Sequence, residues 1–554
     1  MKMRPLRAAL GIVAVALALT VLVAFAGPLL LAATGQPSDP PPVGAAASAS
    51  APSPTGSPAS PAVASPSAAT PSPSPTASPS PTPSPVEVAF VPVTHFRATP
   101  TSTSLKEVRA VLAGTSGRYD ALELVSGEAD AILAALGVAR PADSSRLVLA
   151  SDASKLASDL ATSRKRLAFV RADAVGPSVR ALAWGGDALF GVDRATERSD
   201  WPLVAAFAPG TPSDGFDPSA TWTLFAGGDI LLDRGVYRTL VVEEKGADFP
   251  FDGGTAEITS RYCCSSFGWE LPRTKRTGNA GAVRALIEGA DLAIANFENP
   301  APNRVRWHTR GTVFSADPAL IDGLANAGID YLSLANNHIR DAGGQGILQT
   351  IDNIRERGIE VSGAGVDLAA ARKPAMLEAG GLTVAVLGYD AIAGYYHATA
   401  DKIGSAPLSV SIVRADIKAA RKAGADVVIV FPHWGTEYRS KPFAAQQRLA
   451  RMIVDAGADM VIGNHAHWAA AMEVHDGKPI WYALGNFVFD QTWSEPTMEG
   501  ITLELTFRGF ELVQARMRPH IILDRSQPNF LDTAGDGKVV MGQVFSASKG
   551  LLPW

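Results

Sequence analysis

Five stretches of this chain place an Asp, Glu, Asn or His within a few residues of the end of an apolar run. The most distinctive is the motif LANNH at 334–338, which follows the apolar run 329–334 and precedes a Gly-rich turn at 341–344. Apolar runs of this length are typical of buried strands, and in open α/β sheets the carboxyl ends of strands carry the chemistry. The other four stretches deliver Asp229 after 222–225, Glu298 after 291–295, His433 after 427–431, and the pair His465 and His467 after 460–462.

The residue types at these strand ends indicate a divalent cation. Carboxylate, amide and imidazole groups are the ligands that hard or borderline divalent metals take. A two-metal site also needs one carboxylate shared by ions ~3.5–4 Å apart. Taken singly, each motif also fits a turn residue, a helix cap or a buried core histidine, so the prediction rests on all of them together. The candidate metal ligands are Asp229, Glu298, Asn337, His433, His465 and His467, and the candidate proton donor is His338.

Strands and helices must alternate to bring these residues together. Strands are expected at 222–226, 291–296, 329–334, 359–361, 382–389, 427–431 and 459–462, with helices at about 281–289, 317–327, 344–357, 409–423 and 442–456. Three later strands, at 480–484, 502–507 and 511–517, are joined by short turns and indicate a partly antiparallel sheet. The pattern predicts an α/β fold with two mixed sheets between helices.

The N-terminal part of the chain predicts export. Residues 1–34 carry Lys2, Arg4 and Arg7 and then an apolar stretch at 8–33 that is long enough to span a bilayer. We favour an uncleaved membrane anchor with its positive end in the cytoplasm, and a cleaved signal peptide is the alternative. Residues 35–86 are rich in Ser, Pro and Ala, cannot bury a core, and are expected to be a disordered, extended linker.

Two folded regions are expected after the linker. Residues 87–217 alternate short strands and helices without a ligand cluster, and predict a smaller accessory α/β domain. Residues 91–94 and 112–114 faintly resemble the start of periplasmic solute-binding domains, and an accessory domain without chemistry fits equally well. The Pro-, Gly- and Asp-rich stretch 209–219 marks the boundary to the site domain, 218–520, which is followed by a C-terminal tail, 521–554.

Composition excludes several classes of protein. The 554 residues carry a net charge of −5 and no basic stripe, which argues against nucleic-acid binding. The two cysteines, Cys263 and Cys264, are adjacent, so the chain is neither a disulfide scaffold nor a zinc knuckle. The sequence leaves open whether they form a vicinal disulfide or remain two separate thiols in a loop.

The order of the motifs resembles one family. Gly-Asp, Asn-x-Glu, Asn-Asn-His, His-Trp-Gly and Gly-x-His-x-His follow one another as in the CapA family of poly-γ-glutamate capsule biosynthesis, a branch of the calcineurin-like metallophosphatase superfamily. Further segments that match the family lie at 336–343, 363–365, 433–438, 455–459 and 484–490, so the resemblance runs from about 223 to 490. It implies a four-layer sandwich in which two mixed sheets are flanked by helices.

The resemblance also implies roles for the candidate residues. Asp229 and His467 would bind a first metal, and Glu298 would bridge. Asn337, His433 and His465 would bind a second metal, and His338 would act as the acid beside the leaving group. Leu231 stands where the parent motif has a histidine, so one ion is as reasonable as two, with Mn, Zn, Fe or Mg as candidates.

The implied function is an exported, metal-dependent, hydrolase-like protein at the cell membrane. Its implied partners are poly-γ-glutamate or another anionic polymer and capsule synthesis or export proteins. The alternatives are a non-catalytic polymer-binding or anchoring component of an export assembly, and a phosphoesterase.

Several further residues are candidates for supporting roles at the same site. Arg234 could pair with an anionic substrate or simply lie at the surface, and Glu437 and Asp490 could orient the ligands. His308 could line the site. The aromatic residues Trp434, Trp468 and Phe487 could wall the pocket or belong to the core.

Overall fold

The site domain is built on a ten-stranded mixed sheet. In this computed structural model, which describes residues 84–551, its parallel part is formed by β9 (Thr221–Ile230), β12 (Leu292–Phe297), β13 (Tyr331–Ser333) and β14 (Glu360–Ser362). A short strand, β23 (Asn486–Val488), also runs parallel to β9. The antiparallel part continues from β9 through β24 (Glu499–Arg508), β25 (Glu511–Leu523), β26 (Gln527–Leu531), β10 (Thr255–Tyr262) and β11 (Leu271–Gly278), with only β10 and β26 parallel to each other.

A second sheet of six strands provides the other ligand-bearing ends. Its order is β16 (Ala375–Ala379), β17 (Leu382–Asp390), β19 (Val427–His433), β20 (Met460–Ile462), β22 (Lys478–Trp481) and β21 (Met472–His475). The four inner strands are parallel, and the two edge strands are antiparallel to their neighbours. The inner strands are rich in Val and Ile and are buried, as expected for a parallel sheet covered on both faces.

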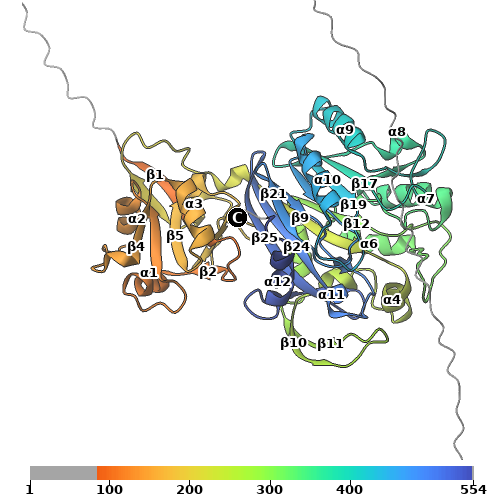
Figure 1. Ribbon diagram of the computed structural model, residues 1–554, viewed down its shortest axis with the longest axis horizontal. Helices are drawn as coiled ribbons and strands as arrows, with labels where there is room; N and C mark the ends of the chain where they lie inside the picture. The colour runs from red at the N-terminus through yellow and green to blue at the C-terminus, as the bar shows by residue number, and fades with distance from the viewer. Residues whose placement is uncertain (1–83, 552–554) are drawn as a thin grey trace, which may run out of the picture. The chain divides into compact units, whose positions relative to one another are not determined.

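Three apolar cores separate four layers (Figure 1). One core lies between the two sheets and joins Leu224 and Ile294 to Val384 and Val427. A second packs the large sheet against α5 (Ala282–Glu288), α6 (Ile321–Asn326) and α7 (Gly343–Arg355). A third packs the small sheet against α9 (Val410–Lys422) and α10 (Ala444–Asp455). The predicted α/β sandwich of two mixed sheets between helices is confirmed.

The region before the site domain has its own sheet of six strands. β4 (Leu147–Ala150), β3 (Ala121–Val125) and β5 (Arg166–Arg171) are parallel, and β1 (Val86–His95) joins β5 to β6 (Val179–Ala181) and β8 (Val204–Phe207) in antiparallel pairings. The helices α1 (Leu105–Leu112), α2 (Ala129–Ala135) and α3 (Ala153–Thr162) contribute Val108, Ile132 and Leu156 to one apolar core. This region is therefore built of both strands and helices.

Buried polar groups of the large sheet are satisfied by this accessory region. The side chain of Gln514 in β25 accepts a hydrogen bond from the backbone N–H of Ala181 at 2.8 Å and donates to the carbonyl of Val179 at 3.1 Å. The carboxylate of Glu504 in β24 accepts from the backbone N–H of Val192 at 2.9 Å. An unpaired buried polar group is costly, so these bonds tie the two regions together.

The described part of the segment 521–554, which the sequence analysis separated as a C-terminal tail, contributes to the sandwich. Its β26 lies between β25 and β10 in the sheet, and α12 (Gly537–Ala547) adds Val540 and Val544 to the core between the sheets.

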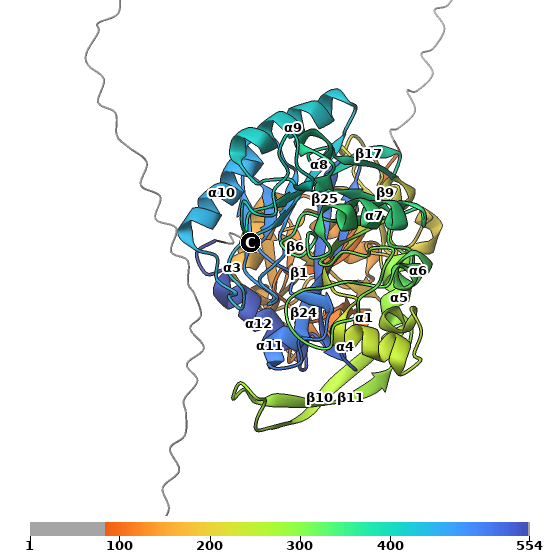
Figure 2. The same ribbon diagram turned by 90° about the vertical axis from the view of Figure 1, so that its right-hand side faces the viewer.

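A hairpin that the sequence pattern did not reveal, β10–β11, extends from the sheet edge (Figure 2). Its connecting loop holds Cys263 and Cys264, which are bonded to each other as a vicinal disulfide.

The expected anchor, 1–34, and all but the last residues of the linker, 35–86, lie outside the described residues. Within 84–551, every helix is too short or too polar to cross a membrane.

Candidate metal centre

All six predicted ligands are buried and lie at the carboxyl ends of strands or in the loops that follow them. Asp229 is the penultimate residue of β9, Glu298 follows β12 directly, and Asn337 lies in the loop after β13. His433 ends β19, and His465 and His467 follow β20. The large sheet therefore supplies the two carboxylates and the amide, and the small sheet supplies the three imidazoles.

Glu298 stands between two groups of potential ligands. Glu298, His433 and His465 offer ligand atoms that all lie within 4.8 Å of one another, and so do Asp229, Glu298 and His467. Asn337 joins the first group, because its Oδ1 lies 2.8 Å from Nε2 of His433. This partition is the one that the family resemblance implied, with Glu298 shared by both groups.

The two carboxylates lie close together in a desolvated site, and this shifts the pKa values of the groups around them. Burial, together with the neighbouring Asp229, raises the pKa of Glu298 well above its usual range. Burial opposes protonation of His467, but the carboxylates of Glu298 and Asp229 prevail and raise its pKa to about 10. Burial and the neighbouring histidines lower the pKa of His433 and of His465. Two neutral imidazoles beside two carboxylates form a donor set suited to a divalent cation.

Glu298 provides the test of whether a metal fits. Both of its carboxylate oxygens are buried and have no hydrogen-bond partner within the described part of the chain. Nε2 of His433 lies 3.5 Å from Oε1, and Nε2 of His467 lies 3.6 Å from the same oxygen. A buried carboxylate without hydrogen bonds is expensive unless a cation binds it. The donor set therefore fits one or two divalent ions.

Local backbone geometry aims the histidine pair at the centre. His465 and His467 both have positive φ, at 91° and 55°, which is uncommon for residues other than glycine. The backbone N–H of His465 donates to Oδ2 of Asp229 at 3.3 Å, and Nδ1 of His467 lies 3.3 Å from the same oxygen. The loop after β20 is thereby bound to the end of β9, across the two sheets.

A close backbone approach fixes the position of Asp229. A Cβ at the preceding residue, Gly228, would lie 1.9 Å from the carbonyl oxygen of Gly485. Only glycine allows β9 and the segment leading into β23 to come this close. The backbone N–H of Asp229 in turn donates to that carbonyl at 3.1 Å.

His338, the predicted proton donor, lies beside the ligands but is bound differently. Its Nδ1 lies 2.9 Å from Oδ2 of Asp341, and its ring packs against Phe314 with centroids 4.1 Å apart. It is close enough to lower the pKa of both His433 and His465. A carboxylate on one ring nitrogen fixes the orientation of the imidazole and leaves the other nitrogen available for proton transfer.

Arg234 and its neighbours form a second layer at the edge of the site. The guanidinium of Arg234 is ion-paired with Asp490 and lies 4.7 Å above the ring of Phe314. His308 binds Asp233 through Nδ1 at 2.6 Å. Asp490 therefore holds Arg234, and His308 holds the loop that follows β9, so neither of them orients a ligand directly.

Glu437 differs from these residues because it is exposed in the loop after β19. Its negative charge helps to raise the pKa of Glu298.

Of the three aromatic candidates, two belong to the apolar core and one lines the site. Trp434 donates through Nε1 to the carbonyl of Tyr482 and belongs to the core under α10, and Phe487 packs against Phe225 in the core under α5 to α7. Trp468 is half-buried and meets Tyr438, whose ring in turn lies 6.0 Å from that of His467. Trp493 and Trp269 extend this aromatic wall toward the β10–β11 hairpin.

Sequence reasoning missed two polar residues that contact the ligands, Asn296 and Asn486, and one that holds a neighbouring loop, Asp390. Nδ2 of Asn296 donates to Oδ1 of Asp229 at 2.7 Å, and Oδ1 of Asn486 lies 2.9 Å from Nδ1 of His467. Asp390 ends β17 in register with His433 and binds its own loop through Ile392 and Ser405. Asn296 and Asn486 lie inside the motifs that resemble the CapA family, and Asp390 follows an expected strand. The position of each residue beside a motif or at a strand end could therefore have identified it.

Known proteins match the central part of the chain. Residues 223–491 match the family model described as bacterial capsule synthesis protein PGA_cap. The PGA biosynthesis protein CapA of Bacillus subtilis is 32% identical over 271 residues, which cover 48% of this chain and 63% of that protein. The capsule biosynthesis protein CapA of Bacillus anthracis is 34% identical over 220 residues, which cover 38% of this chain and 54% of that protein.

The chain thus spans less than two thirds of the length of these two curated relatives. Among solved structures, the calcineurin-like phosphoesterase YfkN of Bacillus subtilis aligns with 60% of this chain and 97% of that chain, at 11% identity and a TM-score of 0.32. The family model matches the part of the chain that carries the six candidate ligands. The resemblance to the CapA family that the order of the motifs predicted is therefore confirmed for residues 223–491, which match the bacterial capsule synthesis family PGA_cap.

Proposed function

We propose that this chain is an exported, metal-dependent, hydrolase-like protein that acts on poly-γ-glutamate or another anionic polymer of the cell surface. The observation that carries the proposal is Glu298, a buried carboxylate without hydrogen bonds that two groups of ligands share. Export is supported by the positive flank and apolar run of residues 1–34. The polymer is proposed from the printed names of the curated relatives.

The residues of the site would have different chemical roles. A divalent cation bound by the six ligands would act as a Lewis acid toward an amide or phosphoester oxygen. His338, oriented by Asp341, would donate a proton to the leaving group. Arg234, near the same edge, would attract an anionic substrate, although its pairing with Asp490 already offsets part of its charge. The aromatic wall of Tyr438 and Trp468 would limit the access of water.

One observation favours a second candidate, a non-catalytic polymer-binding module. Leu231, at the position where the parent motif has a metal-binding histidine, is fully buried and packs with Phe314, Phe489 and Ile522. An apolar side chain in that place removes one ligand of the first ion. In this candidate a single ion bound at Glu298, His433 and His465 would hold an anionic chain without cleaving it.

Metal content tests the site on which both candidates depend. We expect His465→Ala and Asn337→Ala to lower bound metal by about tenfold or more at a fixed free concentration, because each removes a ligand from a buried shell. Their melting temperatures, measured without metal, should stay near that of the wild type, since strand ends are not the apolar core.

The control is His475→Ala, because the ring of His475 lies at the end of β21, 2.8 Å from Asp455 and apart from the ligands. Elemental analysis of each purified protein gives the result. Equal metal content in wild type, His465→Ala and Asn337→Ala would rule out the proposed centre.

A further inference from the structure

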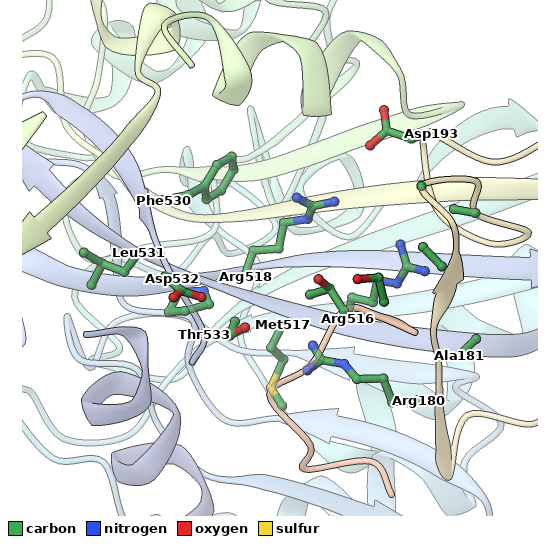
Figure 3. Close-up of a pocket in the computed structure, with 16 residues that line it drawn as sticks. Arg180, Ala181, Asp193, Arg516, Met517, Arg518, Phe530, Leu531, Asp532 and Thr533 are labelled. Atoms are coloured by element: carbon green, nitrogen blue, oxygen red, sulfur yellow. The ribbon is translucent and has the colours of Figure 1, made fainter. Parts of the chain in front are cut away.

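A second cavity lies where the accessory region meets the large sheet. Its volume is about 460 Å³, and it shares no residue with the metal centre. β6 supplies Arg180 and Ala181 to its lining, β25 supplies Arg516, Met517 and Arg518, and the segment around β26 supplies Phe530 to Thr533. Figure 3 shows the side chains of the three arginines gathered in this cavity.

The sheet pattern explains why two of the arginines occur together. Arg516 and Arg518 are two residues apart in β25, so they point to the same face of the sheet as Gln514. Glu504 lies opposite Arg516 in β24 and is fully buried. Its Oε1 is 3.5 Å from Nη1 of Arg516, and its Oε2 is 2.6 Å from Nη2 of Arg518.

The positive charge of the three arginines exceeds what the buried carboxylate of Glu504 beside the cavity neutralises. Arg516 and Arg518 share the single charge of Glu504, while Arg180 forms no ion pair among the residues described. Within the described residues, the guanidinium of Arg180 donates a hydrogen bond to the carbonyl of Ala98. Two other carboxylates, of Asp193 and Asp532, belong to the lining but are exposed to solvent.

Neighbouring groups add to this excess. Arg97 and Arg180 both line a smaller neighbouring pocket, and Nε of Arg97 is buried without a hydrogen-bond partner within 84–551. Burial, together with Arg516 and Arg518, lowers the pKa of Arg180 to about 10, and burial with Arg164 lowers that of Arg97. Like charges packed this closely repel one another, and a bound anion would relieve the repulsion.

The remaining walls of the cavity are apolar. Met517, Phe530 and Leu531 line it beside the arginines, and Ala181 and Ala188 line it from the accessory region. A guanidinium fork matches the geometry of a carboxylate or a phosphate, and apolar walls favour a ligand with a hydrocarbon or aromatic body.

We propose that this cavity binds a small organic anion. Its carboxylate or phosphate group would pair with Arg180 and with the outward donors of Arg516 and Arg518, while its apolar body would lie against Phe530 and Leu531. Because Arg180 comes from the accessory region and the other two arginines from the large sheet, the ligand would bind both regions at once. The inference is independent of the proposed activity at the metal centre.

The test uses the full-length protein and two probes that share an aromatic body, benzoate as the carboxylate and phenylphosphonate as the phosphate-like anion. Calorimetry at constant ionic strength should show saturable 1:1 binding of at least one probe. Arg180→Gln should weaken that binding by at least about tenfold, because it removes the arginine that no carboxylate neutralises. Arg140→Gln is the matched control, since Arg140 is an exposed arginine of the accessory region that pairs with Asp130.

Two further measurements test where the probe binds. His465→Ala should leave the affinity unchanged, which separates this cavity from the metal centre. In the wild type, hydrogen exchange should slow at 179–184 and 514–519 when the probe binds, so the result does not depend on the folding of a variant. Failure of both probes to bind, equal affinity in Arg180→Gln, or protection only around 463–468 would overturn the proposal.

Discussion

At the scale of single residues, His338 differs from the six ligands in what holds it. Asn337 lies 2.8 Å from His433, inside the group of ligands, whereas the next residue binds Asp341 and packs on Phe314. A group fixed by a carboxylate outside the ligand shell is suited to proton transfer, not to holding an ion.

We expect His338→Ala to keep its metal and to lose turnover by about 100-fold or more, the usual contribution of a general acid. Metal content is measured on the same sample as hydrolysis of bis(4-nitrophenyl) phosphate and of a γ-linked glutamate oligomer. Loss of metal in this variant would make His338 a ligand. Unchanged turnover of a substrate that the wild type cleaves would exclude it as the acid.

The sequence predicted the six candidate ligands because each follows an apolar run that forms a buried strand. It could not predict that Asn296 donates to Asp229, or that Asn486 lies next to His467. Those contacts depend on the register of β12 and β23 against β9, which local sequence does not specify. Whether the six residues bind metal in solution stays a prediction.

At the scale of elements, the end of β1 is sensitive to acid. His95 is half-buried, and burial together with Arg164, Arg180 and Arg97 lowers its pKa from 6.5 to about 4. The folded state therefore takes up a proton less readily than the unfolded state. The stability that the neutral ring contributes is present above pH 6.5 and is lost as the pH falls toward 4.

We expect His95→Gln to reduce this loss. Between pH 7.5 and pH 5.0 the free energy of unfolding of the wild type should fall by about 1 kcal/mol more than that of the variant, after allowing for solvent screening of a half-buried ring. Urea unfolding at the two pH values provides the measurement. Equal losses in the two proteins would show that protonation of His95 does not affect folding.

The elements that the sequence did not reveal are those with weak periodicity. β10 and β11 are largely exposed and carry several charged side chains, so they lack the alternation of a half-buried strand. β26 reads QPNFL, with a proline and an asparagine that disfavour a strand, yet all five residues are buried. Its neighbours β10 and β25 override the local preference.

Helix α9, in contrast, was predicted to within one residue, because Ser409 caps its start and apolar positions recur along it.

At the scale of the whole chain, the proposed export can be tested directly. The charged start and apolar run of 1–34 predict that the described part of the chain faces outward, tethered by residues 35–86. Protease added to intact protoplasts should release a soluble fragment that begins within 35–86, because an extended Ser/Pro/Ala-rich segment is accessible to cleavage whereas the sandwich is compact. A fragment that appears only after the cells are lysed would contradict the proposed orientation.

The division of the ligands between the two sheets has a consequence for the order in which the protein assembles. Asp229, Glu298 and Asn337 belong to one sheet and the three histidines to the other, so neither sheet alone presents a complete coordination shell. Metal uptake during refolding should therefore lag behind the formation of each sheet and coincide with their docking. A chain that crosses the membrane unfolded would acquire its metal only at its destination, from whatever ions the surroundings of the cell supply.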